Sequence, residues 1–507
     1  MRLHPTRAFL ATLLSALAFG IAPQDSSAQE GAGLEEVQPN PGLQSRSDGA
    51  FAGYTLINPL SSTKTVLVDM GGEIVHTWDS GENAGGLSYL LEDGSLVRSA
   101  LVPDNPRFNG GGMSGRLQRF SWDGELVWDY VMADDYQTLH HDIAVLPNGN
   151  FLAIAWEHRY REDAIEFGRD PKAITDKGMW TDAVYELRPI LPDDAEIVWE
   201  WHAWDHLIQD FDPDKENFGS ISDHPELIDI NADHRGQPAM SAEEKKSKEE
   251  IEDQMRATGY AGEEEEEEEK EKDGAPAQNS RSTLPDWLHT NAVNYHPDLD
   301  LIVLSTPNLN EVWVIDHSLS TDDTAYNSGG RFGKGGGLLY RWGNPRNYGT
   351  GGLGDRALFY QHDPSWLGGA DDLRLLLFNN GSGRDGSYSS VEELHLPFDA
   401  KEGFERQPGQ SFGPDQPSWI YVDRGNFFSA FISGAQRLPN GNTLICEGAK
   451  GRVFEVTSEY EIVWDFINPV GGDAPTKKGQ PSVPPQSLFR ATRVALDHPA
   501  VRNLVSK

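Results

Sequence analysis

The chain has 507 residues, of which 37 % are hydrophobic and 14 are tryptophan, so it holds ample apolar material for packed cores. Its formal net charge of −38 argues against binding to nucleic acid or to an anionic membrane, because contacts with phosphate groups need clustered lysine and arginine. The single cysteine, Cys446, excludes an internal disulfide, and its strand-like surroundings predict a small buried hydrophobe.

The first 28 residues have the pattern of a secretory signal peptide. Arg2 and Arg7 supply a positive start, an apolar run follows, and Ser26-Ser27-Ala28 offers small residues for cleavage. The apolar run is too short for a transmembrane helix, and no later stretch is apolar enough to span a bilayer. Residues 29–49 are polar and are expected to form a mobile leader. We therefore predict an exported protein, periplasmic or secreted, with no membrane span.

Residues 50–501 have the pattern of repeated short strands. In Ser433–Pro469 the runs AQRLP, NTLICEG, GRVFEVT and EIVWDF alternate apolar and polar residues, and Gly, Asn or Ser separates them. Related phrases occur upstream, such as HDIAVLPNGNFLAIAWE from His141 and WDGELVWDY from Trp122. A repeated unit of four short strands is typical of a β-propeller, because one blade cannot bury both faces of its own sheet.

The units predict an all-β fold with six blades. In chain order they begin at YTLINPL, LSYLLEDGSLVRSAL, the strand around Leu139, DWLHTNAV, FYQHDPSWL and SGAQRLP. The tail SLFRATRVALDHP is expected to return to the first blade and close the ring. Residues 210–282 interrupt the pattern, with few apolar residues and the run EEEEEEEKEKD. Such a segment cannot bury enough surface to offset ordering, so we predict a disordered or loosely helical acidic insertion.

Three histidines stand at matching positions in consecutive blades. His141, His289 and His362 each lie near the start of the innermost strand. Residues at one blade position face one another across the central channel, so these imidazoles are predicted to share a site. Because imidazole is the usual proton-transfer group near neutral pH, these three histidines are candidate catalytic residues. The alternative is that they reflect repeat ancestry without chemistry.

Arg384 is the fourth candidate catalytic residue. It closes FNNGSGR directly after the second strand of the fifth blade, and its guanidinium fork suits a tetrahedral oxyanion such as sulfate or phosphate. Asn379 and Asn380 in that turn and Asn291 in HTNAV are candidate substrate-binding residues. Alternatively, Arg384 is a turn residue paired with an acid.

A metal site is the competing chemistry. Nitrogen and oxygen ligands would come from His141, Asp142, His289, His362 and Asp363. The chain has no HxH or HExxH spacing, and an arginine in the pocket opposes a cation. We therefore expect no metal, and the absence of a P-loop, a Rossmann fingerprint and GxSxG gives no support for a cofactor.

These motifs resemble the bacterial arylsulfotransferase family. The likeness lies in DWLHTNAV, YRWGNP, QHDPSWL with LFNNGSGR, and SGAQRLPNGNTLICEG with EIVWDF, and it covers Tyr54–Pro499 apart from the insertion. The resemblance implies a six-bladed propeller that moves a sulfuryl group from an aryl sulfate donor to a phenolic acceptor, through a sulfated histidine and without a nucleotide. By motif, His289, His362 and Arg384 match the family's channel histidines and its oxyanion-binding arginine.

One departure bears on the nucleophile. The family's nucleophilic histidine lies on the blade after the His/Arg blade, where this chain has Ser433-Gly434-Ala435-Gln436. Either His141, His289 or His362 takes that role, or the protein does different chemistry. The alternatives are a hydrolase or lyase on the same scaffold, and a non-catalytic propeller that binds a ligand or a partner protein.

Overall fold

The computed structural model describes residues 40–471 and 486–505, except for residues 61, 104, 234–245, 247–249, 252 and 256–284. The predicted signal peptide, residues 29–39 of the predicted leader and most of the predicted acidic insertion lie outside the described residues. Across the part that is described, no helix has both the length and the apolar character needed to cross a bilayer.

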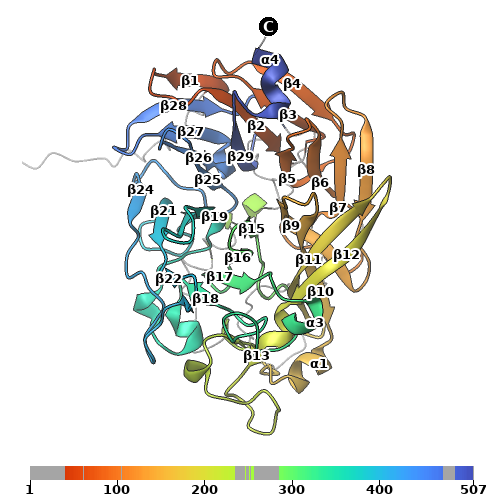
Figure 1. The fold of residues 1–507 in the computed structure, drawn as a ribbon, viewed down its shortest axis with the longest axis vertical. Coiled ribbons are helices and arrows are strands. Elements are labelled where there is room, and N and C mark those ends of the chain that lie inside the picture. Colours follow the sequence, from red (N-terminus) through yellow and green to blue (C-terminus); the bar gives the residue numbers. More distant parts are fainter. Residues whose placement is uncertain are drawn as a thin grey trace, which may run out of the picture. The chain divides into compact units, whose positions relative to one another are not determined.

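Six antiparallel sheets of four or five strands make up the described part of Asn40–Lys507 (Figure 1). The first three blades, each from its inner to its outer strand, are β29 (Leu488–Ala495), β2 (Gly53–Pro59), β3 (Lys64–Val68) and β4 (Ile74–Asp79); β5 (Ala84–Leu90), β6 (Leu96–Leu101), β7 (Gly115–Phe120) and β8 (Leu126–Val131); and β9 (Gln137–Val145), β10 (Phe151–Arg159), β11 (Met179–Ile190) and β12 (Asp194–His202).

The other three blades follow the same order. They are β15 (Ala292–His296), β16 (Leu301–Thr306), β17 (Glu311–Asp316) and β18 (Tyr340–Trp342); β19 (His362–Leu367), β20 (Arg374–Asn379), β21 (Ser390–His395) and β24 (Trp419–Val422); and β25 (Gly434–Arg437), β26 (Thr443–Glu447), β27 (Arg452–Val456) and β28 (Ile462–Ile467), with β1 (Gly42–Arg46) outside β28.

The sheets close into a ring. Each inner strand contacts the inner strands of both neighbouring blades, in the order β29, β5, β9, β15, β19, β25 and back to β29 (Figure 1). One hydrophobic cluster lies between each pair of adjacent blades, as a propeller requires. The predictions of an all-β, six-bladed propeller and of a tail strand that returns to the first blade are confirmed.

Tryptophans on the outer strands form hydrogen bonds between neighbouring blades. In five blades the indole N–H donates to a main-chain carbonyl of the next blade or of the loop beside it. The pairs are Trp78 with Ser121, Trp128 with Asp194, Trp199 with Leu319, Trp342 with Pro414 and Trp464 with Met70. The recurring tryptophan of the sequence therefore fills the space between blades and satisfies its own polar group there.

Two stretches differ from the sequence prediction. Gly42–Arg46, within the predicted mobile leader, forms β1 because its backbone pairs with β28. Residues 210–233, within the predicted insertion, pack on the propeller: Ile228 and Ile230 are fully buried, and β14 (Ile228–Asp229) pairs with β13 (Leu207–Ile208). A few apolar side chains in a polar stretch are enough to anchor it.

The remaining described elements are short. They are α1 (Arg161–Glu166), α3 (Thr321–Thr324), α4 (Arg502–Val505), the hairpin β22 (Phe398–Asp399) with β23 (Gly403–Phe404), and single 3-10 turns at Ala203–His206, Ile221–Asp223, Pro345–Tyr348, Leu353–Asp355, Gly448–Lys450 and Pro499–Val501.

The inner strands carry a repeated irregularity that positions side chains at the channel. In β9, residues 140–142 stand opposite a single residue of β10. In β19, the pairing likewise skips from His362 to Ser365. The bulge of β9 contains His141 and Asp142, and that of β19 begins directly after His362 and contains Asp363. Bulges of this kind re-aim side chains beside functional sites.

Candidate active site

The structure brings the three predicted histidines together. The ring centroids of His141 and His289 are 4.4 Å apart. The Tyr360 ring lies 5.9 Å from both His289 and His362, and the Phe489 ring lies 6.1 Å from His362 and 6.2 Å from His141. All three histidines are buried. Residues more than 70 positions apart in sequence thus form one cluster, which we call the histidine cluster.

The backbone at this cluster is strained. His141 has φ of 52° and His289 has φ of 56°, a left-handed conformation that non-glycine residues seldom adopt. Asp363, in the equivalent bulge of β19, has φ of 54°. Such conformations cost free energy and are held in place by the surrounding structure, typically at functional sites.

His140 holds the His141 ring in place through a hydrogen bond. Its Nδ1 lies 2.7 Å from Nδ1 of His141, so one imidazole donates to the other. The His140 ring stacks on Trp156 with centroids 4.2 Å apart, and its Nε2 lies 3.6 Å from Asp182 Oδ1. His141 is therefore fixed by a second, fully buried histidine.

The imidazoles of His140, His141 and His362 are held neutral. Burial lowers the pKa of all three, and a charge on His289 would lower each pKa further. For His362 the pKa falls to about 3. Neutral imidazole is the form that acts as a nucleophile or as a base.

Hydrogen bonds select the tautomer of His362. The Asn380 amide nitrogen donates to the carbonyls of Ser429 and Ile432, so its Oδ1 faces the ring and accepts from His362 Nδ1 at 2.7 Å. The proton therefore lies on Nδ1. Nε2 is left with its lone pair and, among the described residues, with no hydrogen-bond partner.

His289 forms a dyad with an acid. Its Nδ1 lies 2.5 Å from Asp286 Oδ2, and both side chains are buried. A carboxylate in this position orients an imidazole and stabilises its protonated form, as in hydrolase triads. Nearby, burial and the charge of Asp286 raise the pKa of Asp182 well above its usual value, so Asp182 is a neutral acid that accepts from the Thr290 N–H.

Arg490 joins the His-Asp dipeptides of two blades. Its Nη2 lies 2.8 Å from Asp142 Oδ2, and its Nε lies 3.0 Å from Asp363 Oδ1. Although burial disfavours its charge, these two carboxylates raise the pKa of Arg490 well above its usual value. Tyr89 donates to Asp142 as well. The two carboxylates considered above as metal ligands are thus ion-paired with Arg490.

Arg384 lies in a polar cluster of the fifth blade, the blade that also carries His362. Its Nη1 donates to Ser390, its Nη2 lies 3.5 Å from Glu392, and its guanidinium stacks on Phe359 and Tyr388. Asn379 belongs to this cluster, since it also donates to Glu392.

The candidate substrate-binding asparagines have mainly structural partners. Asn291 donates to the carbonyl of Gln361, and its Oδ1 is buried without a hydrogen-bond partner in the described chain. Asn379 donates to Ala357, and Asn380 holds His362 together with two carbonyls. Of the three, Asn380 is the one whose side chain hydrogen-bonds to His362.

Ser433 occupies the sixth-blade position where the family has its histidine. It is fully buried with φ of 89°, and its Oγ donates to Ser429 Oγ and accepts from the Gly448 N–H. Within the described residues, no group of three or more His, Cys, Asp or Glu side chains has the geometry to hold a metal ion.

Sequence reasoning missed four residues of this site. His140, Asp182, Asp286 and Arg490 were not among the predicted site residues. Two signals in the sequence were available. One is the His140-His141 pair. The other is the His-Asp dipeptide at equivalent positions of two blades, because two buried carboxylates that face each other need a cation between them. Arg490 lies on the tail strand, whose return to the first blade was predicted, and the structure shows that this strand is the inner one of the blade.

The solved structures to which this chain is similar are distant in sequence and in fold. A Bacteroides caccae protein of unknown function is 11 % identical with a TM-score of 0.40, and the match covers 87 % of this chain and 99 % of that chain. The periplasmic gluconolactonase of Pseudomonas aeruginosa is 10 % identical with a TM-score of 0.36, over 87 % of this chain and 99 % of that chain. No curated protein matches the sequence.

The family comparison is more specific. The family model described as Arylsulfotransferase (ASST) matches residues 61–330, which is more than half of the chain. The matched region includes His141 and His289, two members of the histidine cluster. The chain belongs to the arylsulfotransferase family.

Proposed function

We propose that this protein transfers a sulfuryl group from an aryl sulfate ester to a phenolic acceptor, with His362 as the nucleophile. The observation that carries the proposal is the state of His362: its imidazole is neutral, its Nδ1 proton is held by Asn380, and its Nε2 lone pair has no partner among the described residues. The Asp286–His289 dyad lies in the same cluster.

In the first half-reaction, the Nε2 lone pair of His362 attacks the sulfur of the donor. The bond between sulfur and the aryl oxygen breaks, and the aryl oxygen takes a proton from His289. Asp286, at 2.5 Å, stabilises the protonated form of His289 before this transfer. The products are a phenol and a sulfated His362. The positive ring of sulfated His362 donates its Nδ1–H to Asn380 Oδ1, and this hydrogen bond stabilises it.

In the second half-reaction, the acceptor phenol gives its proton to His289 and its oxygen attacks the sulfur. The nitrogen–sulfur bond breaks and its electron pair returns to Nε2 of His362. The cycle leaves the protein unchanged and needs no metal or nucleotide. By the family motif, Arg384 would bind the sulfuryl oxygens as the bonds exchange.

Burial favours transfer over hydrolysis. His362 is 1 % exposed and His289 is 5 % exposed. A site that excludes water protects a reactive sulfated intermediate until a phenol arrives.

Trapping the intermediate tests the proposal. The protein is mixed with p-nitrophenyl sulfate in the absence of acceptor, quenched at once and digested. We expect the peptide that contains His362 to gain the mass of one SO3 group, and a protein carrying His362→Ala to gain none. Sulfation of the His141 peptide instead, or of no peptide, contradicts this role for His362.

We also propose that residues 1–28 direct export, on the sequence pattern alone. Cell fractionation of a bacterial host tests this: the protein should be found outside the cytoplasm and should lack those residues. Retention of the full-length chain in the cytoplasm contradicts it.

A further inference from the structure

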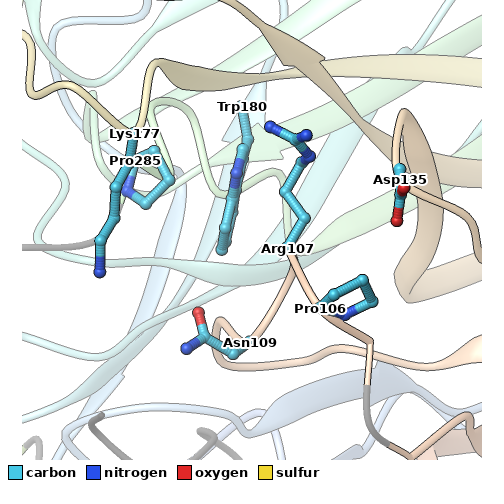
Figure 2. A pocket seen from close by; sticks show the side chains of 7 residues that line it. All are labelled: Pro106, Arg107, Asn109, Asp135, Lys177, Trp180 and Pro285. Atoms are coloured by element: carbon cyan, nitrogen blue, oxygen red, sulfur yellow. The ribbon is translucent and has the colours of Figure 1, made fainter. Parts of the chain in front are cut away.

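A pocket of about 370 Å³ lies where segments of the second and third blades meet the segment before β15 (Figure 2). Its lining comes from the segment between β6 and β7, the segment between β8 and β9, the start of β11 with the turn before it, and the segment before β15. The lining residues are Pro106, Arg107, Asn109, Asp135, Lys177, Trp180 and Pro285. Its volume suits a small organic ligand.

Two indole rings in series, Trp180 and Trp156, separate the pocket from the histidines. Trp180 lines the pocket, and its ring centroid is 5.1 Å from that of Trp156. The Trp156 ring in turn lies 4.2 Å from His140, 6.0 Å from His141 and 6.5 Å from His289. The pocket is thus two indole rings away from the proposed acid–base dyad.

The backbone provides a second connection. Residues 105–114, which we call the 105–114 loop, run from the pocket to the cluster. At one end are the lining residues Arg107 and Asn109. At the other end the Gly112 carbonyl accepts from the His141 N–H at 2.7 Å, and a Cβ on Gly112 would lie 2.2 Å from His141 Nε2. Movement of this loop is therefore coupled directly to His141.

The pocket offers donors suited to an anion. Arg107 has no carboxylate partner in the part of the chain that the structure describes, although the protein as a whole carries a net charge of −38. Trp180 is 1 % exposed, and its indole N–H finds no acceptor among the described residues. Figure 2 shows the Trp180 ring between Arg107 and Lys177. A planar ring next to a guanidinium suits a flat molecule with a negative group.

The geometry points to this pocket as an outer binding site for the aryl sulfate ion, which the ion occupies before it reaches the histidine cluster. The sulfate group faces Arg107, and the aryl ring lies in the pocket next to the part of Trp180 that lines it. This inference rests on the proposed function for its choice of ligand. It goes further by assigning recognition of the donor to residues outside the channel.

Equilibrium binding separates this site from the chemistry. Phenyl sulfate is titrated into protein carrying His362→Ala, which cannot turn over, and binding is followed by tryptophan fluorescence and calorimetry. Adding Arg107→Gln should weaken binding about tenfold, since a charge-assisted hydrogen bond is lost. Arg107→Lys should recover most of the affinity, and Lys401→Gln, at an exposed cation elsewhere, is the control. Phenol and inorganic sulfate should each bind more weakly than phenyl sulfate.

Steady-state kinetics gives the second readout. In the otherwise unmodified protein, Arg107→Gln should raise the KM for p-nitrophenyl sulfate about tenfold and change kcat less than twofold. Unchanged affinity and unchanged KM in Arg107→Gln, or no binding of phenyl sulfate at all, overturn the outer site. Binding that depends on Arg107 in a protein without sulfuryl transfer supports the pocket and refutes the proposed function.

Discussion

Arg490 and Asp142 form the ion pair at which the blades of this propeller meet, with Nη2 and Oδ2 2.8 Å apart. Asp142 also accepts from the Val293 N–H of the fourth blade and from Tyr89 of the second. On its other side Arg490 pairs with Asp363, which accepts from the Ala435 N–H of the sixth blade. The first blade supplies Arg490 itself, so all six blades meet in one network.

Removing the cation from this network should destabilise the whole ring. Arg490→Met leaves two buried carboxylates without their partner, which costs about 3–5 kcal/mol of unfolding free energy. Urea unfolding followed by tryptophan fluorescence measures the loss. The control is Arg188→Gln, whose pair with Glu196 is exposed (54 % and 49 %) and should contribute less than about 1 kcal/mol. Equal costs for the two variants would refute the role of Arg490.

The His289 dyad should matter most when the leaving group needs a proton. We expect Asp286→Asn to lower kcat for phenyl sulfate about 100-fold, the usual scale for loss of general acid catalysis. The loss should be smaller for p-nitrophenyl sulfate, because p-nitrophenolate leaves more readily without a proton. Initial rates with the two donors measure this difference.

Asp182→Asn is the matched control for that variant. Because the pKa of Asp182 is raised by burial and by Asp286, its side chain is already neutral, and an amide reproduces both its shape and its bond from the Thr290 N–H. We expect less than about a threefold change in kcat. A loss as large as that of Asp286→Asn would show that the charge in this cluster has been assigned to the wrong residue.

The depressed pKa of His362 makes stability depend on pH. The folded protein takes up its proton on this ring only near pH 3, whereas the unfolded chain takes it up near the usual pKa of 6.5. The stability from the neutral ring is therefore complete above pH 6.5 and is lost as pH falls toward 3. Between pH 6 and pH 5, the unfolding free energy of the native protein should fall more steeply than that of His362→Gln, by about 1 kcal/mol per pH unit.

Urea unfolding across that pH range provides the measurement, and His224→Gln is the control for replacing an exposed histidine. Parallel slopes for the native protein and His362→Gln would mean that the folded ring takes up its proton at the same pH as the unfolded chain. That result would contradict the depressed pKa of His362.

Gly112 should be intolerant of any side chain because of His141. Gly112→Ala places a Cβ about 2.2–2.3 Å from the imidazole ring, so the histidine or the 105–114 loop must move. Gly124→Ala is the matched control: it has a similar φ of 86° but open space around the Cβ, so it carries only the backbone cost of about 1 kcal/mol. We expect Gly112→Ala alone to lower kcat at least tenfold. Equal activity in the two variants would argue against a tight fit at His141.

Much of the fold was predictable because each blade carries its own local signals. Alternating apolar residues, turns rich in Gly, Asn and Asp, and outer-strand tryptophans recur along the chain, with Pro-Asn-Gly at the turns of the third and sixth blades, and each of these signals acts over a few residues. The three histidines were predicted to meet because a repeat places equivalent positions around one axis. That reasoning needs no side-chain detail.

The site residues that were not predicted make contacts that do not follow the repeat of the sequence. Asp286 reaches His289 within an irregular segment, where no spacing rule applies, and Arg490 lies on a strand that the ring brings back from the chain end. Asn380 was predicted as a substrate ligand, whereas its amide holds the His362 ring and two carbonyls. The side chains of β1 are mostly exposed. Its sequence therefore has no apolar pattern that would predict the pairing with β28.

The most direct test of the account is the release of p-nitrophenol from p-nitrophenyl sulfate by the purified protein, with and without added phenol. We predict that phenol accelerates the release and that phenyl sulfate forms in equal amount. Release that is independent of phenol, with free sulfate as the product, would show a hydrolase. Absence of release under both conditions would contradict sulfuryl transfer from this donor and leave a binding function for the propeller.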